Sequence, residues 1–433
     1  MEFLLKNKEN KMNILILLKS FNYPPSNGGD QAVFNAIDRL SKHVQFHIIN
    51  TDGSEQGRKS LKSFCKDYPS IPGCVYDLNR KDKYQRIKSS TDRVSNFINN
   101  RNGNKDKVNM RLLNGYDARL DYYYDFYQFL NKYIVQNKID VIQAEFHFTL
   151  GFLKGIAVPV KKVFVQHEIQ FVVEHQRLIQ HQYSEKELYF FKQLRQQEIN
   201  AMNACDAIIT LSKDDKVRLI NNGVHTPIFA SFAQITLHNI EINYPVEIIN
   251  RLVFIGPETH MPNKQGVEWF LNDVFPLIRK VVPDTKLDII GRWSSGTVTT
   301  WKNKYEGLDF LGFVDDLPKA IANSILIVPL FQGSGIRMKI LEACNVGIPF
   351  VSTSIGAEGL GFTSGKDCFI EDDNKKFAND VITILTDNAV ANRIIKESQR
   401  HIGTFTDSSF VKTRMNCYNK ILNNDGAKKS TMD

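Results

Sequence analysis

Two series of short apolar runs, each followed by a segment with helical periodicity, constrain the fold of this chain more than any other feature. A short apolar run bounded by turn residues fits a buried strand of a parallel sheet. Strands that alternate with helices are typical of doubly wound sheets, so we expect an α/β protein with two Rossmann-like domains that face each other across a cleft. The first series is residues 13–18, 44–50, 140–144, 162–166 and 207–211, and the second is 251–256, 286–291, 308–313, 324–330 and 349–353.

Chain length supports two domains, since 433 residues exceed one ordinary hydrophobic core. We expect an N-terminal domain at 12–240, a second domain at 251–405, and a helix at 406–425 that packs back on the first domain. Residues 238–250 look like the connection and residues 1–11 like a loose leader. In doubly wound domains, ligands bind at the carboxyl ends of the strands, so the site residues should follow the apolar runs.

Cysteine usage and hydropathy indicate a cytoplasmic protein. The six cysteines form no C-x-x-C pair and no cluster with histidine at metal-ligand spacing, which predicts reduced thiols and no metal site. The N-terminus lacks the apolar core of a signal peptide, and no apolar run approaches the length of a transmembrane helix. An arginine-rich tract and an aromatic RNA-binding signature are also missing, which argues against nucleic acid as a partner.

The net charge of +8 has two interpretations. One is an ordinary basic surface, and the other is a surface that meets a nucleotide, anionic lipid headgroups or an acidic glycan. The basic region at 80–111 would suit peripheral contact with an anionic inner membrane face.

The densest chemistry of the sequence is FQGSGIRMKILEA, which follows the apolar run SILIVPL. Gly333 and Gly335 allow a tight turn and a close approach of the backbone to a ligand. A helix that begins near Ile336 would present its free N–H groups to an anion, and Arg337 and Lys339 would add two cations. We therefore expect a diphosphate site here, although a surface Lys–Glu pair on the helix is the alternative for Lys339 and Glu342.

These residues resemble the donor-binding signature of retaining glycosyltransferases of family 4, which have the GT-B fold. The similarity is to the bacterial branch that builds surface polysaccharides, with its G-x-G-x-R-x-K-x-L-E-A, G-x-P-V-V-x-T and G-x-E-G-L runs. This chain has GSGIRMKILEA, GIPFVST and GAEGL, and the resemblance extends over most of 251–400. It implies transfer from a nucleotide-diphosphate sugar to a glycan or lipid-linked acceptor, with the second domain binding the donor and the first the acceptor.

The resemblance assigns roles in the second half. Glu342 matches the glutamate that holds the nucleotide ribose, but Ser334 stands where the family has a glutamate near the donor sugar. Lys264 stands in for a family lysine after the first strand, which here ends at Gly256 without the usual arginine. Phe313 and Val314 belong to the segment whose backbone frames the base.

In the first half, Gly28 and Gly29 lie between a strand and a helix, either as an ordinary turn or, as the resemblance implies, as a loop that approaches the donor phosphate or the acceptor. His167 ends a strand and matches a family histidine near the reacting sugar, with a structural histidine as the alternative. Glu145 and His147 follow the preceding strand and could contact the acceptor or act as a base. Glu198 matches a recurrent family position and is expected to stabilise a helix.

The expected mechanism assigns leaving-group stabilisation to Arg337, Lys339 and the glycine loop, without metal or cofactor. Two alternatives stay open from the sequence: a nucleotide-sugar epimerase on the same fold, and a non-catalytic protein that binds nucleotide or glycan. The tyrosine-rich stretch at 122–127 reads as a buried helix face, with an aromatic acceptor platform as its alternative.

Overall fold

The protein forms two compact units. The computed structural model describes residues 11–25, 27–78, 116, 123–180, 183–232, 234 and 245–429, with side chains as far as residue 423. Unit 1 comprises residues 1–232 and 410–433, and unit 2 comprises residues 233–409. The predicted leader, the connection at 238–250 and the basic region at 80–111 lie wholly or mostly outside the described residues.

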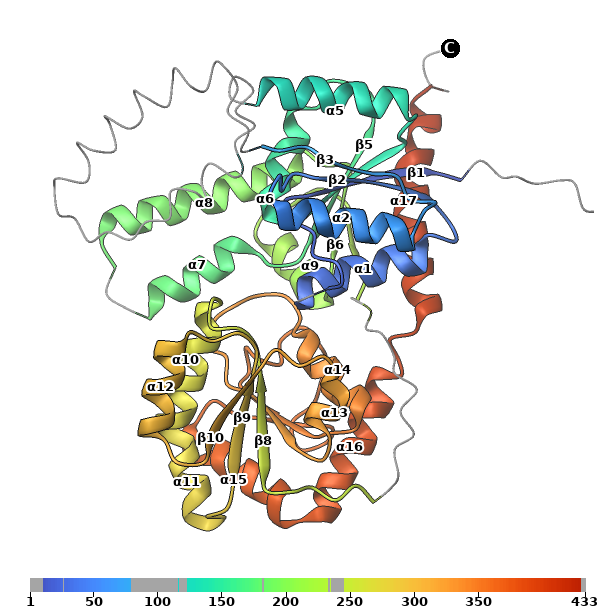
Figure 1. Cartoon of the computed structure of the whole chain (residues 1–433). Coiled ribbons are helices and arrows are strands. Elements are labelled where there is room, and N and C mark those ends of the chain that lie inside the picture. The colour runs from blue at the N-terminus through green and yellow to red at the C-terminus, as the bar shows by residue number, and fades with distance from the viewer. Residues whose placement is uncertain are drawn as a thin grey trace, which may run out of the picture. The chain divides into compact units, whose positions relative to one another are not determined.

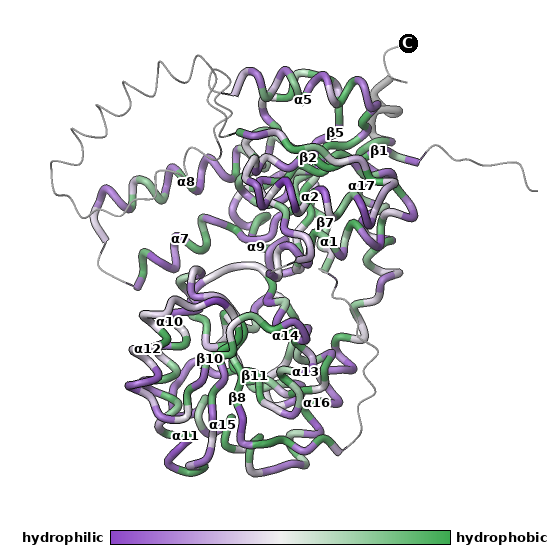
Figure 2. Tube along the Cα trace, viewed as in Figure 1, coloured by the Kyte–Doolittle hydropathy of each residue, from purple (hydrophilic) through white to green (hydrophobic). Residues whose placement is uncertain are grey.

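Unit 1 is built on a seven-stranded parallel sheet of order β3-β2-β1-β4-β5-β6-β7. Its central strands are almost completely buried, as their apolar sequences require, and β4 has no exposed residue. Figure 2 shows the hydrophobic residues concentrated along the strands. The strands are β1 (Asn13–Leu18), β2 (Gln45–Asn50), β3 (Gly73–Val75), β4 (Val141–Glu145), β5 (Lys161–Gln166), β6 (Ala207–Thr210) and β7 (Ile228–Ala230).

Helices connect these strands (Figure 1). Several begin at a polar cap: Asn27 accepts a hydrogen bond from the Asp30 N–H at 3.0 Å, and Ser184 forms a capping box with Glu187. The helices are α1 (Gly28–Leu40), α2 (Glu55–Asp67), α5 (Tyr124–Gln136), α6 (His147–Leu150), α7 (Gln170–Ile179), α8 (Glu185–Asn203) and α9 (Lys213–Asn221), with a 3₁₀ turn at Gly151–Gly155.

The last helix, α17 (Asp407–Lys429), joins unit 1 from Phe410 onward. Its Tyr418 donates a hydrogen bond to Gln143 on β4 at 2.6 Å, and its Arg414 donates one to Ser231 at 3.1 Å. Both contacts are buried, so α17 is an integral part of this unit.

Unit 2 contains a six-stranded parallel sheet of order β10-β9-β8-β11-β12-β13. Its strands are β8 (Arg251–Ile255), β9 (Lys286–Ile290), β10 (Leu308–Gly312), β11 (Ile325–Val328), β12 (Phe350–Ser352) and β13 (Phe369–Ile370). The helices are α10 (Met261–Trp269), α11 (Phe275–Val281), α12 (Ser295–Lys304), α13 (Leu317–Ile321), α14 (Met338–Val346), α15 (Asn374–Thr386) and α16 (Asn388–Ile402), with a π-helical turn at Phe270–Val274. The two parallel sheets confirm the expected pair of Rossmann-like domains.

Three helices of the protein have distinctive N-terminal parts. Asp373 caps α15, because its carboxylate accepts the N–H groups of Lys375 and Lys376. Of the tyrosine-rich stretch, Phe126 and Tyr127 are buried as expected, but Tyr124 is 61% exposed. The helical segment that follows β8 begins at Met261 and continues through the π-helical turn into α11.

All six cysteines are free thiols. Within the described part of the chain, no helix combines the length and apolar character needed to cross a membrane.

Candidate active site

The glycine loop of unit 2 lies between β11 and α14, where the sequence placed it. Gly333 and Gly335 have φ values of 124° and 78°, a region that residues with a side chain rarely adopt. A Cβ on Gly333 would also lie 2.6 Å from Nη2 of Arg337, so only glycine fits. Ser334 between them is buried, with 4% exposure.

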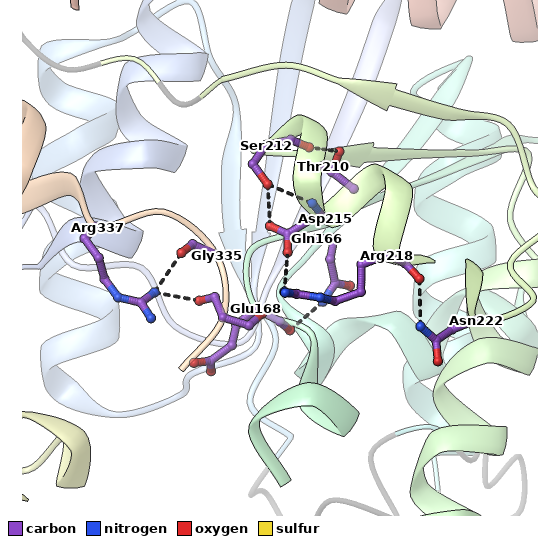
Figure 3. A network of polar contacts seen from close by, with 10 residues as sticks. Gln166, Glu168, Thr210, Ser212, Asp215, Arg218, Asn222, Gly335 and Arg337 are labelled. Carbon is purple, nitrogen blue, oxygen red and sulfur yellow. Dashed lines mark hydrogen bonds and ion pairs between the residues drawn. The ribbon is translucent and has the colours of Figure 1, made fainter. Parts of the chain in front are cut away.

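Arg337 does not lie in the first helical turn as predicted. The helix begins at Met338, and Arg337 is the preceding residue, with extended backbone. Its Nη1 donates hydrogen bonds to the carbonyl oxygens of Ser334 at 2.8 Å and Gly335 at 2.7 Å (Figure 3). The guanidinium therefore ties the loop carbonyls together, which fixes the loop in one conformation ahead of α14.

Lys339, the second residue of α14, reaches toward the carboxyl end of β8. Its Nζ lies 4.5 Å from the ring centroid of Phe254 and 3.5 Å from Oδ1 of Asn263 on α10. Burial, and secondly the charge of Arg337, lowers the pKa of Lys339 to about 7, although Glu342 acts in the opposite direction. An anion placed beside this ammonium group would restore its charge.

Gly256 allows close packing at the end of β8. Its φ is 155°, and a Cβ there would lie 2.5 Å from the Asn263 side chain. The Gly256 carbonyl accepts a hydrogen bond from Trp293 Nε1 at 2.9 Å, and Asn263 donates to the Pro257 carbonyl at 3.0 Å. The glycine thus lets Asn263 stand between β8 and Lys339.

Lys264, predicted to bind the donor, is engaged within unit 2. Its Nζ lies 2.7 Å from Oε1 of Glu258, which also accepts from Thr297 and from the Ser294 N–H, both at 2.6 Å. Burial raises the pKa of Glu258, but these hydrogen bonds outweigh it and hold the pKa at about 2. The ionised Glu258 therefore balances the Lys264 charge, and the pair links the β8–α10 loop to α12.

The remaining predicted residues of unit 2 lie on α14 and in the loop after β10. Glu342 is half-buried on α14, one turn after Lys339. Phe313 and Val314 follow β10; Phe313 is 59% exposed, and the guanidinium carbon of Arg292 lies 6.0 Å from its ring centroid. Since β8, β9 and β10 are neighbours, these loops share the carboxyl-end edge of the sheet.

In unit 1 the structure joins Glu145 and His167 directly. Glu145 is the last residue of β4, His167 follows β5, and Oε2 of the former lies 2.6 Å from Nε2 of the latter. Phe146 has a φ of 64° and stacks on the His167 ring, with centroids 3.9 Å apart. A non-glycine residue at this φ is strained, so the surrounding contacts hold the ring in place.

Gly29 belongs to the same cluster. Gly28 and Gly29 are the first two residues of α1, and a Cβ on Gly29 would lie 3.1 Å from the Phe146 ring. The turn is therefore an ordinary helix start whose Gly29 lets an aromatic ring approach the backbone, and its contact with the donor phosphate stays a prediction.

His147, at the start of α6, is separate from this pair. Burial, and secondly the charge of Lys19, lowers its pKa to about 3, so the imidazole is neutral near pH 7. Among the described residues no hydrogen-bond partner lies at its Nε2.

Two features of the carboxyl ends of β5 and β6 support the site. Glu198, on α8, is fully buried and accepts the N–H groups of Gln170 and Phe171, at 3.0 and 2.9 Å, where α7 begins. This agrees with the helix-stabilising role expected for it. After β6, Ser212 caps α9 and bonds Asp215 (Figure 3).

Sequence reasoning missed Phe146, Gln143, Tyr418, Asn263 and Glu258. Gln143 has a local signal, because it lies two residues before Glu145 on one face of β4. Tyr418 has none, since 275 residues separate it from the side chain that it contacts. In the part of the chain that the structure describes, no three His, Cys, Asp or Glu side chains gather as a metal site.

Residues 249–387 match the family model "Glycosyl transferases group 1". An uncharacterized 44.6 kDa protein in the cps region of Klebsiella pneumoniae is 28% identical over 270 residues, which span 57% of this chain and 66% of that protein.

Solved structures of GT-B glycosyltransferases resemble the whole chain. A mutant of TarM from S. aureus, in complex with Fondaparinux, alpha-GlcNAc-glycerol and UDP, has a TM-score of 0.67 at 12% identity, covering 94% of this chain and 100% of that one. HepE from Anabaena, in complex with UDP-glucose, has a TM-score of 0.61 at 13% identity over 94% and 100%. Sucrose-phosphate synthase from Thermosynechococcus elongatus has a TM-score of 0.63 at 13% identity over 94% and 99%. The chain therefore has the GT-B fold, and residues 249–387 of its second unit are similar to glycosyl transferases group 1.

Proposed function

We propose that this protein transfers a sugar from a nucleoside-diphosphate sugar to a glycan or lipid-linked acceptor, with retention at the anomeric carbon, in surface polysaccharide biosynthesis. One observation carries the proposal: the glycine loop leads into α14, and Lys339 stands at the first turn of that helix. The family match over unit 2 and the UDP complexes of structural neighbours support it. The relative from a cps region supports the polysaccharide role.

The leaving diphosphate would accept hydrogen bonds from the N–H groups of the glycine loop and of the start of α14. These groups, with the helix dipole, favour an anion without reorganisation during the reaction. Lys339 would add the cation, since a bound diphosphate raises its pKa and keeps it protonated. Arg337 would act by holding the loop carbonyls away from the anion, a different role from the direct contact expected of it.

Glu342 would accept hydrogen bonds from the ribose hydroxyls, and Gly256, Phe313 and Val314 would border the nucleotide. Ser334 and its neighbouring amides would contact the donor sugar. In unit 1, His167 would act near the reacting sugar, with Glu145 as its partner. His147 and the turn at Gly28 and Gly29 stay proposals for contacts with the acceptor or donor.

No metal or cofactor is proposed, because the amide groups and Lys339 supply the charge stabilisation that a metal ion would otherwise give. We also propose a cytoplasmic protein with peripheral attachment to the inner membrane face. Vesicle flotation tests this attachment: binding should increase with the fraction of anionic lipid, and binding that ignores that fraction would contradict it.

The decisive experiment screens nucleoside-diphosphate sugars by thermal shift and then follows the best donor by NMR, with and without glycan acceptors. The proposal is supported if the sugar is transferred and its anomeric carbon has the same configuration, axial or equatorial, in the product as in the donor. Epimerisation of the donor in the absence of acceptor would indicate an epimerase. Binding without transfer or donor hydrolysis would indicate a binding protein.

The site assignment is tested by Lys339→Met and Glu342→Ala. Lys339→Met should reduce turnover by at least about tenfold, because one fixed cation at a leaving group contributes that much or more. Glu342→Ala should weaken donor binding. Lys280→Met on α11, an exposed lysine of the same unit, is the matched control and should leave both quantities unchanged.

A further inference from the structure

Four side chains of unit 1 form a continuous chain of hydrogen bonds from α17 to the carboxyl end of β5. Tyr418 Oη lies 2.6 Å from Gln143 Oε1, Gln143 Nε2 lies 2.6 Å from Glu145 Oε1, and Glu145 Oε2 lies 2.6 Å from His167 Nε2. Tyr418, Gln143 and Glu145 are at most 2% exposed. In such a dry setting each link polarises the next, and a missing link leaves a polar group unsatisfied.

The hydrogen bonds in this chain can run in one direction only. Glu145 offers its carboxylate oxygens as acceptors, so the Gln143 amide must turn its NH₂ group toward Oε1. The amide oxygen then faces Tyr418, whose hydroxyl must donate to it. Burial raises the pKa of Tyr418, which keeps that proton in place.

The other end of the chain sets the tautomer of His167. Because Glu145 Oε2 accepts, Nε2 of the imidazole carries the proton. Nδ1 of the neutral ring is then the nitrogen that can accept a hydrogen bond or a proton. Phe146 stacks on the ring at an interplanar angle of 22°, so the imidazole plane is held as well as its tautomer.

We propose that Tyr418 is a positioning residue, which acts through Gln143 and Glu145 to keep His167 in its Nε2–H tautomer with Nδ1 available to the substrates. The consequence for turnover rests on the proposed sugar transfer, whereas the tautomer itself does not. The C-terminal helix would then contribute to the reaction through Tyr418, which is itself fully buried.

Tyr418→Phe tests the proposal, because it removes one oxygen and keeps the buried ring. The Gln143 amide loses the donor that fixes its orientation, and it can rotate its oxygen toward Glu145. Selective ¹⁵N labelling of histidine, with His167→Asn to assign the signal, reports the tautomer directly. The wild type should show the Nε2–H form, and Tyr418→Phe should show a substantial share of Nδ1–H. An unchanged tautomer would overturn the proposal.

Tyr133→Phe is the matched control, since Tyr133 also bonds a histidine of unit 1, His47, at 3.1 Å. It should leave the His167 signal unchanged. Gln143→Leu removes the middle link with Tyr418 intact, and it should give the same shift as Tyr418→Phe. It therefore keeps the proposal testable if Tyr418→Phe does not fold.

Kinetics separate positioning from general loss of structure. The kinetics use the donor that the thermal-shift screen identifies. Tyr418→Phe should lower kcat by about tenfold and change the donor KM by less than about twofold, since the proposed nucleotide contacts belong to unit 2. A changed tautomer with unchanged kcat would overturn the link to turnover. If the wild type transfers no sugar, the proposed function fails, while the NMR comparison still decides whether Tyr418 positions His167.

Discussion

Lys339 lies with its Nζ 4.5 Å from the centroid of the Phe254 ring, so the first turn of α14 is joined to the end of β8. The aromatic face stabilises the cation only in part, because burial and Arg337 together bring the pKa of Lys339 down to about 7. The ammonium group is therefore close to half charged in neutral solution, and an arriving anion would complete its protonation.

Proton uptake on nucleotide binding follows from this contact. UDP should raise the pKa of Lys339, so at pH 8 binding should take up nearly one proton, and affinity should fall by about tenfold per pH unit above pH 7. Calorimetry in two buffers with different ionisation enthalpies measures the uptake. Lys339→Arg keeps the charge without titrating and should bind UDP without uptake. Equal uptake in both proteins would exclude Lys339 as its source.

Glu258→Gln should lower the free energy of unfolding by about 1 to 2 kcal/mol at pH 7, because Lys264 and two hydroxyl or amide donors lose their ionised acceptor. The pKa of Glu258 is depressed from 4.5 to about 2, so its contribution is complete above pH 4.5 and is lost as the pH falls toward 2. The free energies of unfolding of wild type and variant, measured by urea titration, should therefore converge as the pH is lowered from 4.5 toward 2.

Asp309→Asn is the control for this change, since its pair with Lys302 is about half exposed on both sides. We expect Asp309→Asn to lower the free energy of unfolding by less than about 0.5 kcal/mol. An effect as large as that of Glu258→Gln would show that burial does not distinguish the two pairs.

Glu198→Ala should lower the free energy of unfolding by about 2 to 4 kcal/mol, because it leaves the buried N–H groups of Gln170 and Phe171 without their acceptors. The hydrogen-exchange rates of those two amides, at the start of α7, should increase more than those of other amides. Glu187→Ala removes a half-buried capping-box acceptor on α8, which also pairs with Arg177, and should lower the free energy of unfolding by only about 0.5 to 1 kcal/mol. Similar exchange at α7 in wild type and Glu198→Ala would refute the capping role.

Gly266→Ala should destabilise unit 2 by several kcal/mol. A Cβ there would lie 2.0 Å from the Pro329 carbonyl oxygen, so α10 would have to move away from the end of β11. Gly296→Ala, within α12, meets no atom within 4 Å and should stabilise the protein by about 0.5 to 1 kcal/mol. The midpoint of thermal unfolding should therefore fall for Gly266→Ala and rise for Gly296→Ala. Midpoints that shift in the same direction would contradict the packing argument.

The carboxyl-end loops were more predictable than the contacts they make. Lys264 and Arg337 were predicted to be cations near the donor because they follow β8 and β11, and that placement stays a prediction. Their partners, Glu258 and the loop carbonyls, depend on side-chain direction, which residue types alone do not specify. Lys264 therefore proved to be paired, and Arg337 proved to lie outside the helix that it precedes.

The sequence alone determined the two parallel sheets, the glycine loop ahead of α14 and the placing of His167 and Glu145 at strand ends. These features are local, because periodicity and the special backbone freedom of glycine act within a few residues. Only the tertiary structure decided that Glu145 bonds His167, that Lys339 lies over Phe254 and that Tyr418 reaches Gln143. Such contacts join side chains from separate elements, and the packing of those elements in three dimensions sets which polar groups meet after water is removed.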